Sequence, residues 1–224
     1  MIVVTIPAHN EEETVGRVVK GVDIALRGQR HKILVFCNNC TDNTMLEAAR
    51  AGAEVVSVPE PGLANVFRAE MKTALKYSPG AVVHIDADGQ YEVNDIPLLL
   101  KYLGGQYDMV MGDRLWKRPN GMTANKFICN KIGSLAYGLM LDCDIPDITT
   151  GFRVFTPEVV KIGAGIKAEL TYTQELTWKV KKAGMRIMSV PVSFYPRKSG
   201  HSRLIKTTFN YIRRSFSDFR RFAL

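Results

Sequence analysis

Short apolar runs alternate with longer amphipathic stretches through the first half of the chain. Mostly apolar runs at 2–6, 32–36, 54–58 and 82–85 predict four strands. Between them, the spacing of apolar residues predicts a helix from Asn10, its N-cap, to about Arg27, and further helices at 42–50 and 63–77. Strands that alternate with helices predict an α/β fold with a mostly parallel central sheet.

Helical patterns continue in the second half. Residues 124–141 form a long helical pattern whose apolar side we expect to be ordinary core, and another helix begins at Tyr172. Over 204–224 we expect a basic amphipathic C-terminal helix, because apolar residues recur at helical spacing and basic residues lie largely off that stripe. Its apolar positions are Ile205, Phe209, Ile212, Phe216, Phe219 and Ala223. The period fits a helix in a lipid interface as well as one packed on the domain or on a second subunit.

Charge is distributed unevenly in an otherwise ordinary globular composition. The 224 residues are 46% hydrophobic and carry a net charge of +8. Residues 197–224 hold eight basic residues and one acid, Asp218, and so account for +7 of that charge. Concentrated positive charge favours an anionic partner such as a membrane surface. We expect no nucleic-acid partner, because the basic residues are confined to one segment and no nucleic-acid-binding motif accompanies them.

Hydropathy and cysteine spacing indicate a reducing, cytoplasmic environment. No apolar run reaches the ~18 residues needed to span a bilayer, and the first strand is too short for a signal peptide. We therefore expect a cytoplasmic protein that meets the inner face of the membrane through residues 204–224. Cys37 and Cys40 have the spacing of half a zinc site or of a redox pair, but Cys129 and Cys143 do not form a second such pair.

Two carboxylates stand where the apolar run at 82–85 ends. Asp86 and Asp88 lie one residue apart and are followed by Gly89. Parallel α/β sheets bind ligands at the carboxyl ends of their strands. Two such carboxylates can share one hard cation and leave its other positions to water and to phosphate oxygens of a nucleotide. The alternative is a solvated turn.

Five motifs, in order along almost the whole chain, resemble glycosyltransferase family 2. Residues 6–11, Ile-Pro-Ala-His-Asn-Glu, resemble its opening motif, and residues 86–90, Asp-Ala-Asp-Gly-Gln, resemble its metal and sugar-nucleotide motif. Residues 112–114, 149–155 and 197–204 are similar to the dolichol-phosphate mannose synthase branch. The resemblance implies a single GT-A domain over 1–203, with a nucleotide-binding half at 1–113 and an acceptor half at 114–203.

The resemblance also implies roles for particular residues. It implies that the nucleotide sugar is held by Pro7, Ala8, Asn10, Glu11, Asn38, Asp86, Asp88 and Gln90, with Mg²⁺ or Mn²⁺ bound by Asp86 and Asp88. It implies that the catalytic residues are Asp88, Arg114 and Arg197. The two arginines would stabilise the negative charge that leaves with the nucleotide. It implies that the acceptor phosphate is bound by Arg114, Arg153, Arg197, Ser202 and Arg203. Structural interpretations stay open: Pro7 and Asn10 as turn and cap residues, and Arg114 as a surface cation.

The chain departs from the family pattern at two functional positions. Residues 37–40 are Cys-Asn-Asn-Cys where members usually have Asp-Asp-Gly-Ser, which leaves the choice of base open. Thr173 stands where many members that glycosylate hydroxyl groups carry an acid. A sugar hydroxyl needs a general base, whereas a lipid monophosphate, with a second pKa of about 6, is largely dianionic at neutral pH. The missing acid favours a phosphate acceptor, unless Glu175 or Glu169 supplies the base.

These observations together predict an inverting hexosyltransferase. We expect the donor to be GDP-mannose or a UDP-sugar and the acceptor to be a polyprenyl or dolichyl phosphate. One alternative is transfer to a hydroxyl of a saccharide or another soluble acceptor. Another is a catalytically silent scaffold of the same fold, against which intact Asp86, Asp88 and Arg114 argue. The oligomeric state does not follow from the sequence.

Overall fold

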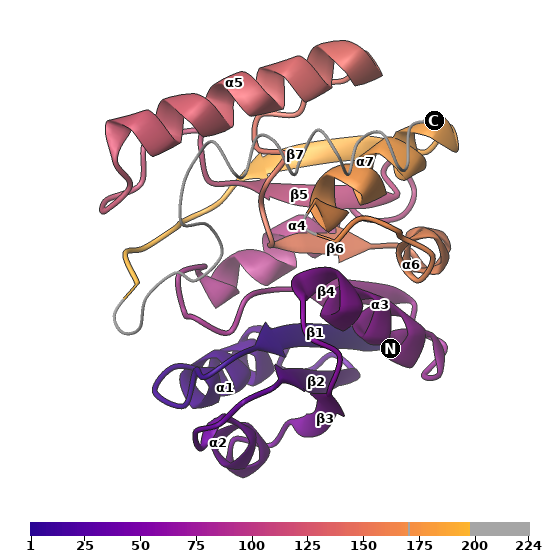
Figure 1. The fold of residues 1–224 in the computed structure, drawn as a ribbon. Coiled ribbons are helices and arrows are strands. Elements are labelled where there is room, and N and C mark those ends of the chain that lie inside the picture. The colour runs from indigo at the N-terminus through magenta and orange to yellow at the C-terminus, as the bar shows by residue number, and fades with distance from the viewer. Residues whose placement is uncertain (170, 198–224) are drawn as a thin grey trace.

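A seven-stranded sheet with the order β3-β2-β1-β4-β6-β5-β7 forms the centre of the molecule (Figure 1). The structure, a computed structural model, describes residues 1–169 and 171–197. The strands are β1 (Ile2–Ala8), β2 (His31–Asn38), β3 (Glu54–Val58), β4 (Ala81–His84), β5 (Met109–Asp113), β6 (Arg153–Phe155) and β7 (Ile187–Pro191). All pairings are parallel except those of β6, which runs antiparallel to both β4 and β5. The predicted α/β fold with a mostly parallel sheet is confirmed.

Helices cover both faces of this sheet. They are α1 (Val15–Ala25), α2 (Thr44–Arg50), α3 (Leu63–Leu75), α4 (Ile96–Tyr102), α5 (Ala124–Leu141), α6 (Pro157–Gly163) and α7 (Tyr172–Lys182), with a short 3-10 turn, η1 (Val93–Asp95). Because successive strand residues point to opposite faces, Val4 of β1 packs with α1 and α4, whereas its neighbour Val3 packs with α3, α6 and α7. The inner strands are therefore buried on both sides, which explains their continuous apolar runs, whereas the edge strands β3 and β7 are partly exposed.

The first helix begins later than the sequence predicts. Asn10 does not cap it: α1 starts at Val15, after Thr14, and Asn10 has a left-handed backbone with φ 54°. The Asn10 side chain instead bonds to Thr41, in the loop after β2. Asparagine tolerates this conformation better than most residues because its short amide forms local hydrogen bonds. Asn10 thus joins two loops rather than starting a helix.

The long helix α5 has the predicted bounds but not the predicted environment. Its apolar side was expected to be core, yet only Ser134 and Leu141 of its residues are buried. Ile128, Leu135 and Leu139 are among the exposed large hydrophobic side chains. The helical period shows which residues share a face but not whether that face has a partner.

One edge of the sheet collects the loops that matter for function. The carboxyl ends of β1, β2, β4, β5 and β7 meet there, together with the start of the antiparallel β6. The predicted C-terminal helix at 204–224, and with it Ser202 and Arg203, lies outside the described residues. Among the helices in the described part of the chain, none has the length and apolar character needed to cross a bilayer.

Candidate active site

Asp86 and Asp88 leave β4 at the carboxyl edge of the sheet, as predicted, but their surroundings differ. The Asp88 carboxylate accepts hydrogen bonds from the Gln90 backbone N–H at 3.1 Å and from Arg197 at 2.8 Å. No described residue donates a hydrogen bond to the Asp86 carboxylate. Burial, followed by the charge of Asp88, raises the pKa of Asp86 to about 6. Asp86 is therefore the carboxylate of this edge that is prepared for a ligand.

A glycine makes room for Asp86. A side chain at Gly151 would place its first carbon 2.8 Å from both carboxylate oxygens of Asp86. Gly151 is held by the Tyr91 hydroxyl, which accepts a hydrogen bond from its backbone N–H at 2.9 Å. The motif at 149–155 thus acts on the site through a close backbone approach, which only glycine permits.

The two carboxylates fit a divalent cation shared with a substrate. No cluster of three or more potential metal ligands occurs in residues 1–169 and 171–197, so these residues do not form a closed metal site by themselves. Mg²⁺ is held in proteins by one or two carboxylates together with water and substrate phosphates. Asp86, without a hydrogen-bond donor among the described residues, and Asp88 beside it meet that requirement.

Arg197 closes the site from the segment after β7. Its guanidinium bridges Glu11 at 3.0 Å and Asp88 at 2.8 Å, so it joins the loops after β1 and β4. The same segment is fixed to the loop after β4 by two hydrogen bonds: the Gln90 side chain donates to the Tyr195 carbonyl, and the Tyr195 N–H donates to the Gln90 carbonyl. Arg197 and Asp88, predicted as catalytic residues from motifs 109 positions apart, are thus in direct contact.

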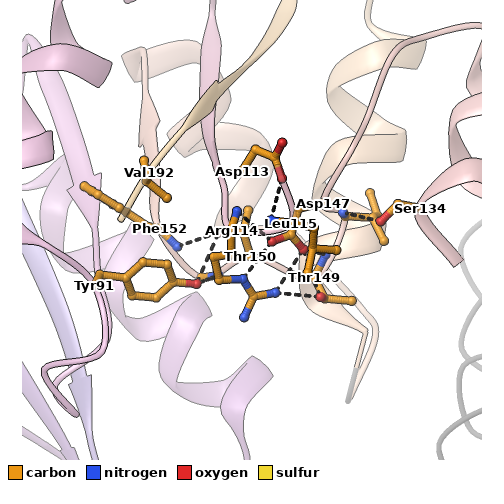
Figure 2. A network of polar contacts seen from close by, with 12 residues as sticks. Tyr91, Asp113, Arg114, Leu115, Ser134, Asp147, Thr149, Thr150, Phe152 and Val192 are labelled. Carbon is orange, nitrogen blue, oxygen red and sulfur yellow. Dashed lines mark hydrogen bonds and ion pairs between the residues drawn. The ribbon is translucent and has the colours of Figure 1, made fainter. Parts of the chain in front are cut away.

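Arg114 is the centre of a polar network at the end of β5 (Figure 2). It forms a two-point contact with Asp147, Nε to Oδ2 at 2.7 Å and Nη2 to Oδ1 at 2.9 Å, and also donates to Thr149. Burial raises the pKa of Asp147, but the Arg114 guanidinium more than offsets this and holds it below its usual range. Arg114 is not the surface cation of the structural interpretation. Its Nη1 has no hydrogen-bond partner within the described residues, and the guanidinium lies over the rings of Tyr91 and Phe194.

The motifs did not include Asp147. The signal available was its position two residues before the Thr149-Thr150-Gly151 motif, in the segment that leads into β6. Sequence spacing does not reveal that this acid orients Arg114, because the two residues are 33 positions apart and meet only in the folded sheet.

Arg153, which was predicted to bind the acceptor phosphate, is instead enclosed in the core. Its side chain is buried at the start of β6. Its guanidinium donates to the carbonyls of Ile148, Thr150 and Thr173 and to the Thr177 hydroxyl. These bonds occupy the group inside the core, where it ties the loop before β6 to α7. A cation surrounded by backbone carbonyls does not reach a ligand at the sheet edge.

The loops after β1 and β2, where the sequence predicts the nucleoside, are joined to each other. Pro7 and Ala8 end β1, and Asn10 is bonded to Thr41 as described above. Asn38 does not read a base with its amide: its Nδ2 donates to the carbonyls of Val58 and Glu60, and its Oδ1 accepts from Gly62. The Asn38 side chain therefore joins the end of β2 to the turn after β3.

The cysteine pair lies at the end of β2 and in the loop that follows it. Cys37 and Cys40 are free thiols; Cys37 is buried and Cys40 is partly exposed. A hydrogen bond from the Cys37 thiol lowers the pKa of Cys40 to about 6, while the same contact, together with burial, raises the pKa of Cys37. Because the thiolate is the reactive form, the two cysteines should differ in reactivity.

Alkylation by iodoacetamide should therefore modify Cys40 at neutral pH and leave Cys37 unmodified. The rate at Cys40 should fall to half its plateau near pH 6, because the thiolate is protonated below its pKa. Peptide mass spectrometry over a pH series measures both sites. In Cys37→Ala the donor is lost, and the midpoint should move to higher pH. An unchanged midpoint in that variant would contradict the hydrogen-bond explanation.

The first turn of α7 lacks a free base. The Glu175 carboxylate, which is buried, accepts hydrogen bonds from the backbone N–H groups of Lys167 and Ala168 and pairs with Lys179. Thr173 donates its hydroxyl hydrogen bond to Gln174. Glu169 is exposed. Glu175 therefore stabilises the loop before α7. The position at which many family members carry an acid is occupied by the Thr173 hydroxyl.

Known proteins resemble this chain in sequence and in structure. The model of glycosyl transferase family 2 matches residues 3–163. Glycosyltransferase AglJ of Haloferax volcanii is 32% identical over 201 residues, which are 87% of this chain and 63% of AglJ, so the chain spans less than two thirds of that relative. An undecaprenyl-phosphate mannosyltransferase of Micrococcus luteus is 28% identical, with 91% of this chain and 87% of the relative covered.

A solved structure supports the fold. Glucosyl-3-phosphoglycerate synthase of Mycobacterium tuberculosis, crystallised with Mn²⁺, UDP-glucose and phosphoglyceric acid, superposes with a TM-score of 0.66 at 20% identity and covers 89% of this chain and 72% of its own. The predicted GT-A fold is confirmed by this likeness, and the predicted family by the match over most of the sheet and its helices. The chain therefore belongs to glycosyl transferase family 2.

Proposed function

We propose that this protein transfers a hexose from a nucleotide diphosphate sugar, GDP-mannose or a UDP-sugar, to the phosphate of a polyprenyl phosphate. The observation that carries the proposal is the state of the carboxylates around the site. Glu11 and Asp88 are bonded to Arg197, Asp147 to Arg114, Asp113 to the Leu115 N–H, and Glu175 to the loop before α7. Among these carboxylates, Asp86 alone accepts no hydrogen bond from a described residue, and we expect it to face the nucleotide sugar.

The donor diphosphate is expected at Asp86 and Asp88. A bound Mg²⁺ or Mn²⁺ would there neutralise charge that develops on the departing diphosphate. Arg197, now paired with Asp88, and the Nη1 of Arg114 supply positive charge on the same side. The nucleoside is expected beside Pro7, Ala8, Asn10 and Glu11, with Asn38 and Gln90 holding the surrounding loops. The complex of glucosyl-3-phosphoglycerate synthase with Mn²⁺ and UDP-glucose is consistent with this donor class.

A phosphate acceptor suits a site in which the first turn of α7 offers no free base. A sugar hydroxyl must lose a proton to attack, and a positioned base usually accepts it. A monophosphate ester already carries its negative charge at neutral pH, since its second pKa is about 6. With Glu175 engaged and Thr173 in the family's acidic position, the described residues favour the acceptor that needs no base. The printed name of the Micrococcus luteus relative, an undecaprenyl-phosphate mannosyltransferase, supports the same class.

The proposed step is one in-line displacement. An acceptor phosphate oxygen forms a bond to the anomeric carbon as the bond from that carbon to the donor's diphosphate oxygen breaks. The nucleoside diphosphate leaves with the electron pair, and no side chain forms a covalent bond to the sugar. Arg114 and Arg197 would stabilise the phosphates on either side of the reacting carbon. The configuration at the anomeric carbon is therefore inverted.

A screen of donors and acceptors tests the proposal. GDP-mannose, UDP-glucose and other nucleotide sugars are incubated with a polyprenyl phosphate, with phosphoglyceric acid, or without an acceptor, in the presence of Mg²⁺ or Mn²⁺. We expect the sugar to be attached to the lipid phosphate. NMR should show that the configuration at its anomeric carbon is opposite to that in the nucleotide sugar. Sugar transfer to phosphoglyceric acid, and not to the polyprenyl phosphate, would establish a hydroxyl acceptor instead. Retained configuration would overturn the single displacement, and inactivity with every donor would favour the scaffold alternative.

A further inference from the structure

Two cysteines stand where β2 ends and the loop to α2 begins. Cys37 belongs to β2 and Cys40 to the loop after it, within the β2–α2–β3 unit at one end of the sheet (Figure 1). A Cys-x-x-Cys pair in such a strand–helix–strand unit is typical of proteins that exchange a dithiol for a disulfide. The other reading of the spacing, half a zinc site, needs further ligands. Within 1–169 and 171–197 no group of three or more potential metal ligands supplies them.

The two cysteine side chains meet on one face of the sheet. Cys37 is part of the buried cluster that α1 and α2 cover, and Cys40 packs against the same cluster. Both lie beside Ala8 of β1: Cys37 pairs with it in the sheet, and the Cys40 sulfur donates to its carbonyl at 3.5 Å. The Cys37 thiol also forms a hydrogen bond to the Cys40 sulfur. Two cysteines can be bridged only if their side chains point toward each other, and these do.

The two thiols differ in accessibility and in their hydrogen bonds. Cys37 is only 1% exposed, whereas Cys40 is partly exposed and can meet a dissolved reagent. The Cys40 sulfur accepts a hydrogen bond from the Asn10 backbone N–H as well as from the Cys37 thiol, and both donors stabilise its thiolate. An accessible thiolate next to a sheltered second thiol is typical of redox-sensing cysteines.

We propose that Cys37 and Cys40 form a reversible dithiol–disulfide site that reacts with small disulfides such as oxidised glutathione. The Cys40 thiolate attacks one sulfur of the small disulfide, whose S–S bond breaks and whose other half leaves as a thiolate. The Cys37 thiol then loses its proton and attacks the Cys40 sulfur, which releases the second half. The two protons that the cysteines lose end on the two released thiols. The protein is thus oxidised by two electrons and the small disulfide is reduced by two.

Oxidation should disturb the loop that is expected to hold the nucleoside, an effect that rests on the proposed function. Between the two cysteines, the amides of Asn38 and Asn39 donate to carbonyls at the end of β3 and in the turn after it. Next to Cys40, Thr41 is bonded to Asn10. A disulfide brings two sulfurs to about 2 Å, closer than any hydrogen bond does, so the backbone between them must shift. The oxidised protein should therefore bind a nucleotide sugar more weakly.

Mass spectrometry after treatment with glutathione tests the redox site. The chain is used with Cys129→Ser and Cys143→Ser, which remove the other two thiols, and also without these changes. Intact masses and peptide maps are recorded after oxidised glutathione and again after dithiothreitol. We expect one internal disulfide, from Cys37 to Cys40, that dithiothreitol reverses. Circular dichroism checks that every variant is folded.

Single substitutions test the order of the two steps. Cys37→Ser should stop at a mixed disulfide of Cys40 with glutathione, because the second thiol is missing. Cys40→Ser should leave Cys37 unmodified, because Cys37 is buried. A wild-type protein that forms no internal disulfide would overturn the proposal, and so would one that stops at the mixed disulfide. Modification of Cys37 in Cys40→Ser at the rate seen for Cys40 would overturn the assigned order.

Calorimetry with GDP-mannose and UDP-glucose in the presence of Mg²⁺ tests the effect on binding. We expect the oxidised protein to bind its nucleotide sugar about tenfold more weakly than the reduced protein, the usual effect of losing one or two hydrogen bonds. In the control, Cys37→Ala with Cys40→Ala, pretreatment with oxidised glutathione should not change the affinity. Equal affinities of oxidised and reduced wild type would refute the link to the nucleoside loop. If the reduced protein bound no nucleotide sugar, the proposed function would be wrong, while mass spectrometry would still decide the redox site.

Discussion

Replacing Asp86 by Asn should lower the rate of sugar transfer by about 10³-fold or more while the protein stays folded. An electrostatic contact made in the transition state is worth roughly 3–4 kcal/mol, and this one also carries the negative charge that a cation needs. The amide fills the same space against Gly151, so the substitution creates no clash. The melting temperature should be unchanged or higher, because burial and the neighbouring Asp88 penalise the ionised form and raise the pKa of Asp86.

Calorimetry with the donor nucleotide measures the same effect on binding. In wild type the affinity should rise when Mg²⁺ or Mn²⁺ is added, and in Asp86→Asn this dependence should be lost. Asp23→Asn is the matched control, since the Asp23 side chain is 68% exposed and its carboxylate pairs with His31. It should behave like wild type in both assays. If nucleotide affinity were independent of metal in wild type, the assignment of Asp86 and Asp88 to a cation would be wrong.

Replacing Arg153 by Met should destabilise the protein by about 3–5 kcal/mol, because it removes the donor of several buried acceptors at once. The methionine fills much of the volume but leaves the carbonyls of Ile148 and Thr150 without their donor. A buried acceptor without a partner costs roughly 1–3 kcal/mol. Arg153→Lys should be intermediate, because an ammonium group is charged but does not span the same four acceptors.

Urea unfolding measures these differences. Arg50→Met is the control, because Arg50 is 66% exposed and makes a surface ion pair with Glu47, worth about 0–1 kcal/mol. A stable Arg153→Met protein that had lost affinity only for the acceptor phosphate would reinstate Arg153 as a binding residue. We expect the reverse. Arg153→Met should lose stability, and sugar transfer by its folded fraction should slow only if the loop before β6 is displaced.

The hydrophobic pattern predicted those features that depend on neighbours in the chain. The bounds of β3 and α5 follow from it, since a strand period or a helical period is visible within a few residues. The parallel α/β class follows from the alternation of these elements. The placement of Asp86 and Asp88 at a ligand-binding edge follows as well, because the carboxyl ends of parallel strands meet there.

Partners distant in the chain decided the rest. The antiparallel insertion of β6 between β4 and β5 was not predicted, because its three residues leave hardly any period. Arg153 and Arg114 are the same kind of residue in two motifs of the same family resemblance. One is enclosed by backbone carbonyls, whereas the other is oriented by Asp147 and has one nitrogen without a hydrogen-bond partner among the described residues. A guanidinium's role depends on burial and on its acceptors, neither of which local sequence specifies.

The apolar face of α5 shows the same division most plainly. Its period was visible in the sequence, and so were the basic residues Lys126 and Lys131 within it. Whether it packs in the core or faces outward depends on which elements cover it, and no helix of the described residues does. Local sequence therefore determined most of the elements, the family and the place of Asp86 and Asp88 at the sheet edge. Tertiary structure alone decided which charges are free and which apolar surface is exposed, because both depend on contacts between segments far apart in the chain.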